Sequence, residues 1–134
     1  MNSMFYGCSS LKELNLNNFN TNKVINMSKM FDKCSSLKEL NLNNFINPNV
    51  VYVVSMFSNC SSLKELNICN FNTTKVDSMY YMFNGCSSLK ELNLGNFNTN
   101  NVIVISSMFS GCSNELIMKI KAQYKNIKKD AFNN

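Results

Sequence analysis

The sequence predicts an α/β repeat solenoid that ends in a helical cap. Three observations predict this fold. A repeat recurs with a fixed period of 26 residues, each repeat combines helix-like with strand-like apolar spacing, and an amphipathic segment breaks the pattern near the C-terminus. Because a solenoid repeat buries its apolar face against its neighbours, we expect a continuous spine along the stack.

The repeat is marked by a Met-Phe pair with a cysteine three residues past the phenylalanine. The pairs begin at Met4, Met30, Met56, Met82 and Met108, and the cysteines are Cys8, Cys34, Cys60, Cys86 and Cys112. No insertion or deletion interrupts this spacing. Equivalent residues should therefore stack in straight columns along the solenoid.

The first half of each repeat carries an apolar stripe with helical spacing. The stripes are Val24, Met27, Met30, Phe31 and Cys34; Val50, Val53, Met56, Phe57 and Cys60; Val76, Met79, Met82, Phe83 and Cys86; and Val102, Ile105, Met108, Phe109 and Cys112. This spacing predicts one short helix of about three turns per repeat. Thr21 is a candidate N-cap for the first of them, because its hydroxyl could accept from a free amide of the first turn.

The second half of each repeat has the alternation of a short strand. The strand positions are Leu11, Leu14 and Leu16; Leu37, Leu40 and Leu42; Leu63, Leu66 and Ile68; and Leu89, Leu92 and Leu94. They predict four strand rungs, each closed by a buried phenylalanine: Phe19, Phe45, Phe71 and Phe97. The asparagine before each phenylalanine is expected to bond the backbone of the turn there. These asparagines are Asn18, Asn44, Asn70 and Asn96.

The C-terminal segment departs from the repeat at Glu115, where the previous copy has Leu89. Its apolar residues recur at helical spacing instead: Leu116, Ile117, Ile120, Tyr124, Ile127 and Ala131. We predict an amphipathic helix over 114–131, with Ser113 or Asn114 as N-cap. Glu115 would lie in the first turn, where its negative charge interacts favourably with the helix dipole. The predicted domains are thus a solenoid over 1–113 and a helical cap over 114–134.

Composition argues against several functional classes. The 134 residues carry a net charge of +5, and all their positively charged side chains are lysines. The absence of arginine disfavours nucleic-acid recognition. Without histidine, a glycine-rich phosphate loop or a converging carboxylate pair, we expect no catalytic residues, no cofactor and no metal. No apolar run is long enough for a membrane span. Because Met1 already lies in repeat register and no signal peptide is visible, we expect the chain to be part of a longer protein.

The run Phe-x-x-Cys-x-x-Leu-x-x-Leu-x-Leu resembles the BspA-like leucine-rich-repeat surface proteins, in the group with 26-residue repeats, over about residues 1–112. The resemblance implies a right-handed leucine-rich-repeat-like solenoid. It also implies a secreted or surface-displayed protein that binds host or matrix proteins. One departure is clear: the position after the strand that usually carries a buried asparagine holds a phenylalanine here.

The cysteine column admits two interpretations. Rungs lie about 4.8 Å apart in a parallel sheet, so disulfides between neighbouring rungs are possible by distance. We favour a column of small buried thiols, because stacked side chains point the same way and five is an odd number. Spacings of 26 residues do not resemble a zinc site. Cys69 replaces an asparagine at an outward position and is a candidate exposed thiol.

Outward residues of the strand rungs form the candidate protein-binding face. They are Glu13, Asn15, Asn17, Glu39, Asn41, Asn43, Glu65, Asn67, Cys69, Glu91 and Asn93. We expect the glutamates to stack in one column and the asparagines in others, where amide ladders could form. A parallel column of lysines, at positions 12, 38, 64 and 90, could offset the glutamate charge.

Two functions remain open from the sequence. The first is a surface-displayed interaction or adhesion module that binds a protein through the strand face, as the resemblance implies. The second is an intracellular scaffold or an inert spacer without a ligand. Self-association through an uncapped N-terminal edge is a further possibility. Because copies differ at Tyr52, Tyr80 and Tyr81, the opposite side of the repeat is an alternative interface.

Overall fold

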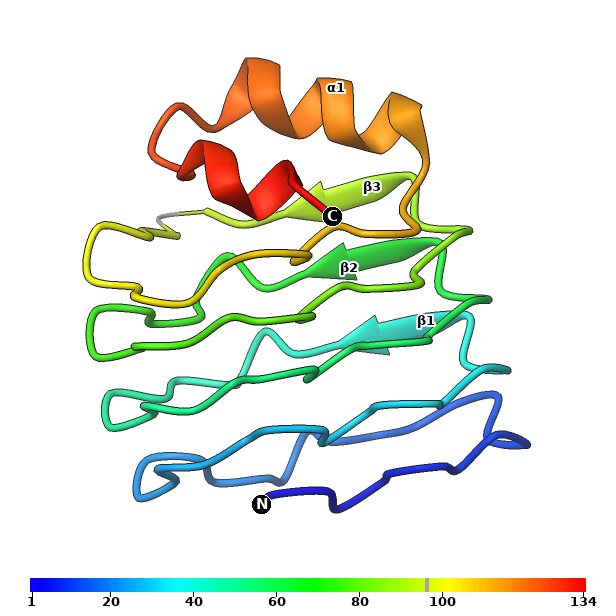
Figure 1. The fold of residues 1–134 in the computed structure, drawn as a ribbon. Coiled ribbons are helices and arrows are strands. Elements are labelled where there is room, and N and C mark those ends of the chain that lie inside the picture. Colours follow the sequence, from blue (N-terminus) through cyan, green and yellow to red (C-terminus); the bar gives the residue numbers. More distant parts are fainter. Residues whose placement is uncertain (96) are drawn as a thin grey trace.

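The computed structural model describes residues 1–95 and 97–134, and these form a stack of coiled rungs, each one repeat long (Figure 1). Three short parallel strands lie in one sheet in the order β1-β2-β3. They are β1 (Glu39–Asn41), β2 (Glu65–Asn67) and β3 (Glu91–Asn93). The register pairs equivalent residues of successive repeats, such as Leu40 with Leu66. The 26-residue period thus sets the sheet register, as the sequence predicts.

Each strand alternates as expected, with the central leucine inward and the flanking glutamate and asparagine outward. The first of the four predicted strand rungs is different, because 13–15 is not a strand. Leu14 of this rung is only partly buried, whereas Leu40 and Leu66 are buried. In the described rungs, burial of the central leucine therefore accompanies strand formation.

The predicted helix in each repeat is wrong. Residues 27–34 form consecutive turns, and no helix precedes α1 in the described residues. Alternate amides use different partners: Met30 N–H donates to Met27 O three residues back, whereas Phe31 N–H donates to Met56 O of the next rung. A parallel bridge ladder also joins the rungs on this side, through Asn26, Tyr52, Ser78 and Val104.

Two columns of residues with left-handed backbone explain why this segment cannot be a helix. The first column contains Ser3, Lys29, Ser55, Tyr81 and Ser107, and the second contains Gly7, Lys33, Asn59, Gly85 and Gly111, all with φ from 55° to 75°. A left-handed residue breaks the i→i−4 bonding of a right-handed helix. Glycine, which adopts this conformation without strain, fills three of the five places in the second column.

The apolar stripes nevertheless face the spine, as predicted. Met30, Phe31 and Cys34 are fully buried, and so are their equivalents in the next two repeats. The phenylalanine rings stack along the spine with centroids 5.3 to 5.7 Å apart. The stack runs through Phe5, Phe31, Phe57, Phe83, Phe109 and Phe132. Phe132 belongs to the C-terminal segment and was not predicted to join it.

The C-terminal segment covers the last rung (Figure 1). Helix α1 (Asn114–Gln123) begins where predicted, with Ser113 as N-cap accepting from Leu116 N–H at 3.2 Å. The predicted helix over 114–131 is too long, however, because α1 ends at Gln123 and the 3₁₀ helix η1 (Lys129–Phe132) follows. The residues after α1 bond to the last rung instead. The backbone carbonyls of Ala131 and Asn133 accept hydrogen bonds from N–H groups of that rung. Among the described residues, no helix has the length and apolar character needed to cross a membrane.

Candidate functional site

The outward face of the strands forms a shallow open groove of about 1000 Å³. It brings together ten of the eleven predicted face residues: Glu13, Asn15, Asn17, Glu39, Asn41, Asn43, Glu65, Asn67, Glu91 and Asn93. Cys69 lies outside this groove, in a smaller hollow with Phe71 and Thr73. Gln123, at the end of α1, also lines the groove but was not predicted. Its spacing of four and eight residues from Lys119 and Glu115 places all three on one helix face.

The glutamate column is real over the three strands, since Glu39, Glu65 and Glu91 occupy one register. All three side chains are exposed. Across residues 1–95 and 97–134, the only ion pair in this column joins Glu91 to Lys119 at 2.8 Å. The expected pairing with the lysine column does not occur in that part of the chain. The remaining carboxylates of the column therefore face solvent without a cationic partner.

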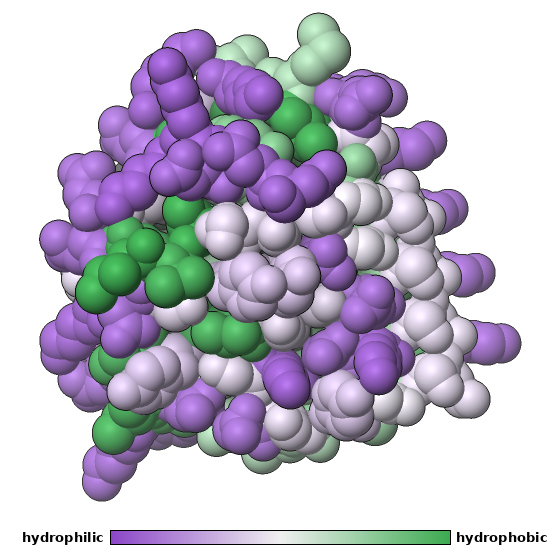
Figure 2. Space-filling model, viewed as in Figure 1, coloured by the Kyte–Doolittle hydropathy of each residue, from purple (hydrophilic) through white to green (hydrophobic). Residues whose placement is uncertain are grey.

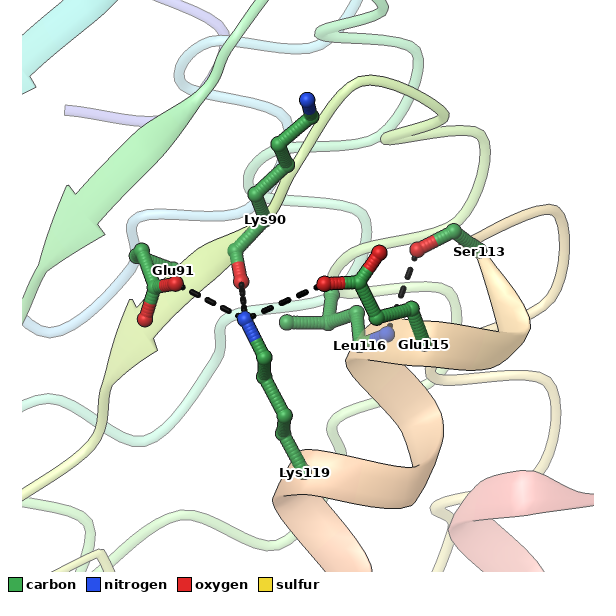
Figure 3. A network of polar contacts seen from close by, with 6 residues as sticks. All are labelled: Lys90, Glu91, Ser113, Glu115, Leu116 and Lys119. Carbon is green, nitrogen blue, oxygen red and sulfur yellow. Dashed lines mark hydrogen bonds and ion pairs between the residues drawn. The ribbon is translucent and has the colours of Figure 1, made fainter.

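Lys119 closes the C-terminal end of the glutamate column (Figure 3). Its ammonium group donates to Glu91 and lies 3.3 Å from Glu115 of the same helix, one turn earlier. It also approaches the carbonyl oxygen of Lys90 at 3.4 Å. The hydrogen bond to Glu91, followed by that to Glu115, raises the pKa of Lys119. The cap thus supplies one positive charge to one end of an otherwise acidic column.

Within residues 1–95 and 97–134, the asparagines of the face do not form the amide ladder that stacking predicts. Asn41 Oδ1 instead accepts from the N–H of Asn43 two residues later, at 3.0 Å, and Asn67 Oδ1 likewise accepts from Cys69 N–H. The same bond recurs from Asn15 to Asn17 and from Asn93 to Gly95. Each of these side chains stabilises the turn that ends its own strand. Their carbonyl ends are therefore committed to the fold.

A second set of asparagines bonds backbone carbonyls, as predicted, but these carbonyls belong to the preceding rung, which was not predicted. Asn44 Nδ2 donates to the carbonyls of Leu16 and Asn17 at 2.9 and 3.0 Å. Asn70 Nδ2 donates to Asn43 O at 3.0 Å. The equivalent Asn96 lies outside the described residues. Asparagine is thus abundant largely because two of its columns form hydrogen bonds with backbone N–H and carbonyl groups.

Thr21 is not a helix N-cap, because the residues directly after it, 22–23, form a turn and no helix, and its side chain is buried. Its hydroxyl donates to Ile46 O of the next rung at 3.0 Å. Thr73 makes the equivalent bond to Asn98 O and also accepts from Asn98 N–H, both at 3.0 Å. This column therefore joins successive rungs at the bend that leads away from the strands.

The cysteine column consists of free thiols. The Cys60 thiol donates to Phe31 O of the preceding rung at 3.1 Å, and Cys86 donates to Phe57 O in the same way. Burial raises the pKa of Cys34 to about 11 and that of Cys112 to about 12. Because thiolates are the reactive form, these thiols are poor nucleophiles. The described residues contain no disulfide and no cluster of metal-binding side chains.

The bridge-ladder side carries exposed apolar side chains. Figure 2 shows them gathered along the outer loops at one edge of the stack. Ile103, Ile46 and Ile25 are 82%, 60% and 57% exposed. Tyr52 is also exposed, whereas Tyr80 and Tyr81 are partly buried against each other. Asp77 interrupts the column that contains Ile25 and Ile103, so this surface is less uniform than the strand face.

Comparison with known proteins adds a family but no activity. No curated protein matches this chain. No solved structure matches it either. A family model described as "Mycoplasma protein of unknown function, DUF285" matches residues 1–124, which include all three strands and α1. Because the match spans nearly the whole chain, this protein belongs to the DUF285 family.

Proposed function

We propose that this chain is a non-catalytic interaction module that binds a protein partner through its strand face. The observation that supports the proposal is the in-register column Glu39, Glu65 and Glu91, of which only Glu91 has a cationic partner within the described residues. Exposed carboxylates at rung spacing favour a partner surface that carries lysine or arginine. The chain as a whole is basic, with a net charge of +5, so this acidic column is distinct from the rest of the surface.

The resemblance to BspA-like leucine-rich-repeat proteins supports the finer proposal. It favours a right-handed coil, as nearly all parallel crossover connections have this hand. It also favours a secreted or surface-displayed protein with a host or matrix protein as partner. Fractionation of source cells, with external protease applied to intact cells, tests the location. Loss of the protein to the protease supports surface display, and a protected cytosolic protein contradicts it.

The binding proposal is tested with immobilised extracellular-matrix proteins and a charge-reversed face variant. Glu39→Lys combined with Glu65→Lys should weaken binding about tenfold or more, and wild-type binding should weaken as salt rises. Asp77→Lys combined with Asp130→Lys is the matched control, since it changes net charge equally away from the face. Equal loss in both variants would show that the strand face is not the binding site.

A spacer without a ligand is the second candidate, and the asparagine geometry favours it. The face asparagines Asn41 and Asn67 use their carbonyl oxygens to stabilise their own turns, so their repetition has a structural cause. The two candidates differ in one measurement. A spacer predicts no saturable binding of any matrix protein by the wild-type chain, whereas an interaction module predicts binding that the face variant loses.

A further inference from the structure

We propose that the lysine column, which consists of Lys12, Lys38, Lys64 and Lys90, binds a linear sulfated polysaccharide that lies along the axis of the stack. This inference goes beyond the proposed function, because it uses a different column of side chains, with the opposite charge, and a ligand that is not a protein. Each lysine directly precedes a glutamate of the strand face, at the bend that leads into the strands.

The lysine column is straight and evenly spaced, because the backbone continues the strand ladder at this position. Lys64 N–H donates to Lys38 O at 3.1 Å, and Lys90 N–H donates to Lys64 O at 2.9 Å. Neighbouring rungs of a parallel sheet lie about 4.8 Å apart, so the ammonium groups are tethered to one line along the stack. Such a line fits an extended polymer that carries anionic groups at regular intervals.

The ammonium groups of this column are not used by the fold. All four lysines are exposed. Across residues 1–95 and 97–134, none of them forms an ion pair, since both ion pairs in that part of the chain belong to Lys119. Lys75, by contrast, donates to Asn49 Oδ1 at 3.0 Å. Like charges at rung spacing repel one another, and a bound polyanion would relieve this repulsion.

The lysine side chains lie apart from the acidic column beside them. The glutamates line the open groove of the strand face, whereas the four lysines, all of which the structure describes, do not line it. Figure 3 shows that the ammonium group of Lys90 points away from Glu91. Figure 2 shows evenly spaced hydrophilic projections along the right-hand edge, where the strands of Figure 1 begin. A polymer along this edge would therefore contact ammonium groups without entering the acidic groove.

Serine hydroxyl groups accompany the lysines at the same bend. The sequence Ser-Ser-Leu-Lys occurs in all four copies. In the copy that contains Lys38, Ser35 and Ser36 form a turn and are only partly buried. Hydroxyl groups donate to sulfate oxygens and exchange hydrogen bonds with sugar hydroxyls. The bend thus offers neutral donors next to each positive charge, which suits an anionic sugar polymer.

The residues around the column favour a polysaccharide over other polyanions. The chain has no arginine, whose planar guanidinium bonds phosphate with two parallel hydrogen bonds. The Ser-Ser-Leu-Lys bend has no aromatic side chain on which a nucleic-acid base could stack. An anionic lipid surface would need apolar anchors beside the lysines, but the exposed isoleucines lie on the outer loops at the opposite edge (Figure 2).

The experiment measures binding of heparin to the full chain by isothermal titration calorimetry over a range of salt concentrations. Wild-type binding should weaken steeply as the salt concentration rises, because binding releases counterions. Lys38→Gln combined with Lys64→Gln should weaken binding about tenfold or more and lower the slope of log K against log salt by about two, one for each ammonium group lost. Heparin without its sulfate groups should not bind.

Two variants serve as controls. Lys23→Gln combined with Lys75→Gln changes net charge equally at exposed lysines outside the column, and it should weaken heparin binding by about twofold at most. Glu39→Gln combined with Glu65→Gln should strengthen heparin binding, because it removes negative charge beside the column. A basic protein partner of the strand face would respond to this second variant in the opposite direction.

Three results would overturn the proposal. The first is a wild-type chain that does not bind heparin at low salt. The second is an equal loss of binding in the two lysine variants, which would show attraction to net charge alone. The third is tighter binding of polyphosphate or single-stranded DNA than of heparin, with the same dependence on Lys38 and Lys64, which would assign the column to another polyanion.

Discussion

The strand side and the turn side of each rung share one register but use different backbones. On the strand side, β1 to β3 have regular alternation, and their apolar spacing identifies them correctly. On the turn side, an apolar spacing of three is typical of a helix, yet the chain forms turns with two left-handed residues per rung. A three-residue apolar step can therefore arise from i→i−3 turns as well as from a helix.

The comparison implies that the two sides should respond differently to substitution. The strand side depends on burial of its central leucines. The turn side depends on bonds to the next rung and on its left-handed positions. Four changes test these statements, in order of decreasing expected effect.

The largest expected effect comes from Leu66→Asp on the strand side. Leu66 is 2% exposed at the centre of the middle strand, so the variant would bury an unpaired carboxylate. This should reduce the free energy of unfolding by several kcal/mol and unfold the stack or divide it. Urea denaturation measures the loss, and the adjacent Asn67→Asp, which keeps its acceptor for Cys69 N–H, should cost much less. Unchanged stability of Leu66→Asp would contradict the assignment of the spine.

Thr73→Val tests the bond between rungs at the bend. The valine keeps the shape but leaves the carbonyl and amide of Asn98 without their hydroxyl partner. Because Thr73 is 3% exposed, we expect a loss of about 1–3 kcal/mol in the free energy of unfolding. Thr74→Val is the matched control at an exposed position, and its free energy of unfolding should fall less. Equal losses would show that the buried hydroxyl does not hold the rungs together.

Lys29→Gly distinguishes turn from helix by the sign of its effect. Lys29 is exposed with φ of +56°, where glycine is unstrained, so we expect an increase of about 0.5 kcal/mol in the free energy of unfolding. If Lys29 lay in a helix, its substitution by glycine would instead lower the free energy of unfolding by about 1 kcal/mol. We expect such a loss for Met118→Gly in α1. A loss at both positions would favour the helical interpretation of the turn side.

The smallest expected effect is the loss of folding stability that follows from ionisation of the buried thiols. This loss should be weak at neutral pH and should grow as the pH rises. Burial raises the pKa of Cys34 to about 11, whereas an unfolded cysteine ionises near pH ~8.5. The unfolded state therefore loses its thiol proton first, and stability present below pH ~8.5 should decline as the pH rises towards 11. Melting temperatures from pH ~7 to ~10 measure this decline. Cys34→Ala should reduce it and Cys69→Ser should not; an identical decline in Cys34→Ala would rule out this cause.

Much of the candidate site follows from the repeat pattern. Equal spacing predicted that Glu39, Glu65 and Glu91 share a register, and the strands confirm it. Lys119 was not predicted at the end of this column, because its place depends on how α1 packs across β3. The asparagine bonds were predicted only for Asn44 and its equivalents. At Asn41 the side chain could bond either its own turn or the next rung, and residue identity does not distinguish these partners.

The period, the register and the identity of the buried columns follow from the amino-acid sequence alone. Repeats of equal length that are stacked by translation must place equivalent residues above one another, and apolar columns must face inward. In contrast, the turn conformation of the apolar stripes and the end of the C-terminal helix depend on contacts between segments that are far apart in the sequence. The amides of Phe31 and Phe109 can bond within a helix or to a neighbouring segment, and the carbonyls of Met56 and Ala131 lie where they accept those bonds. Such partners are distant in sequence and become available only when the stack has formed.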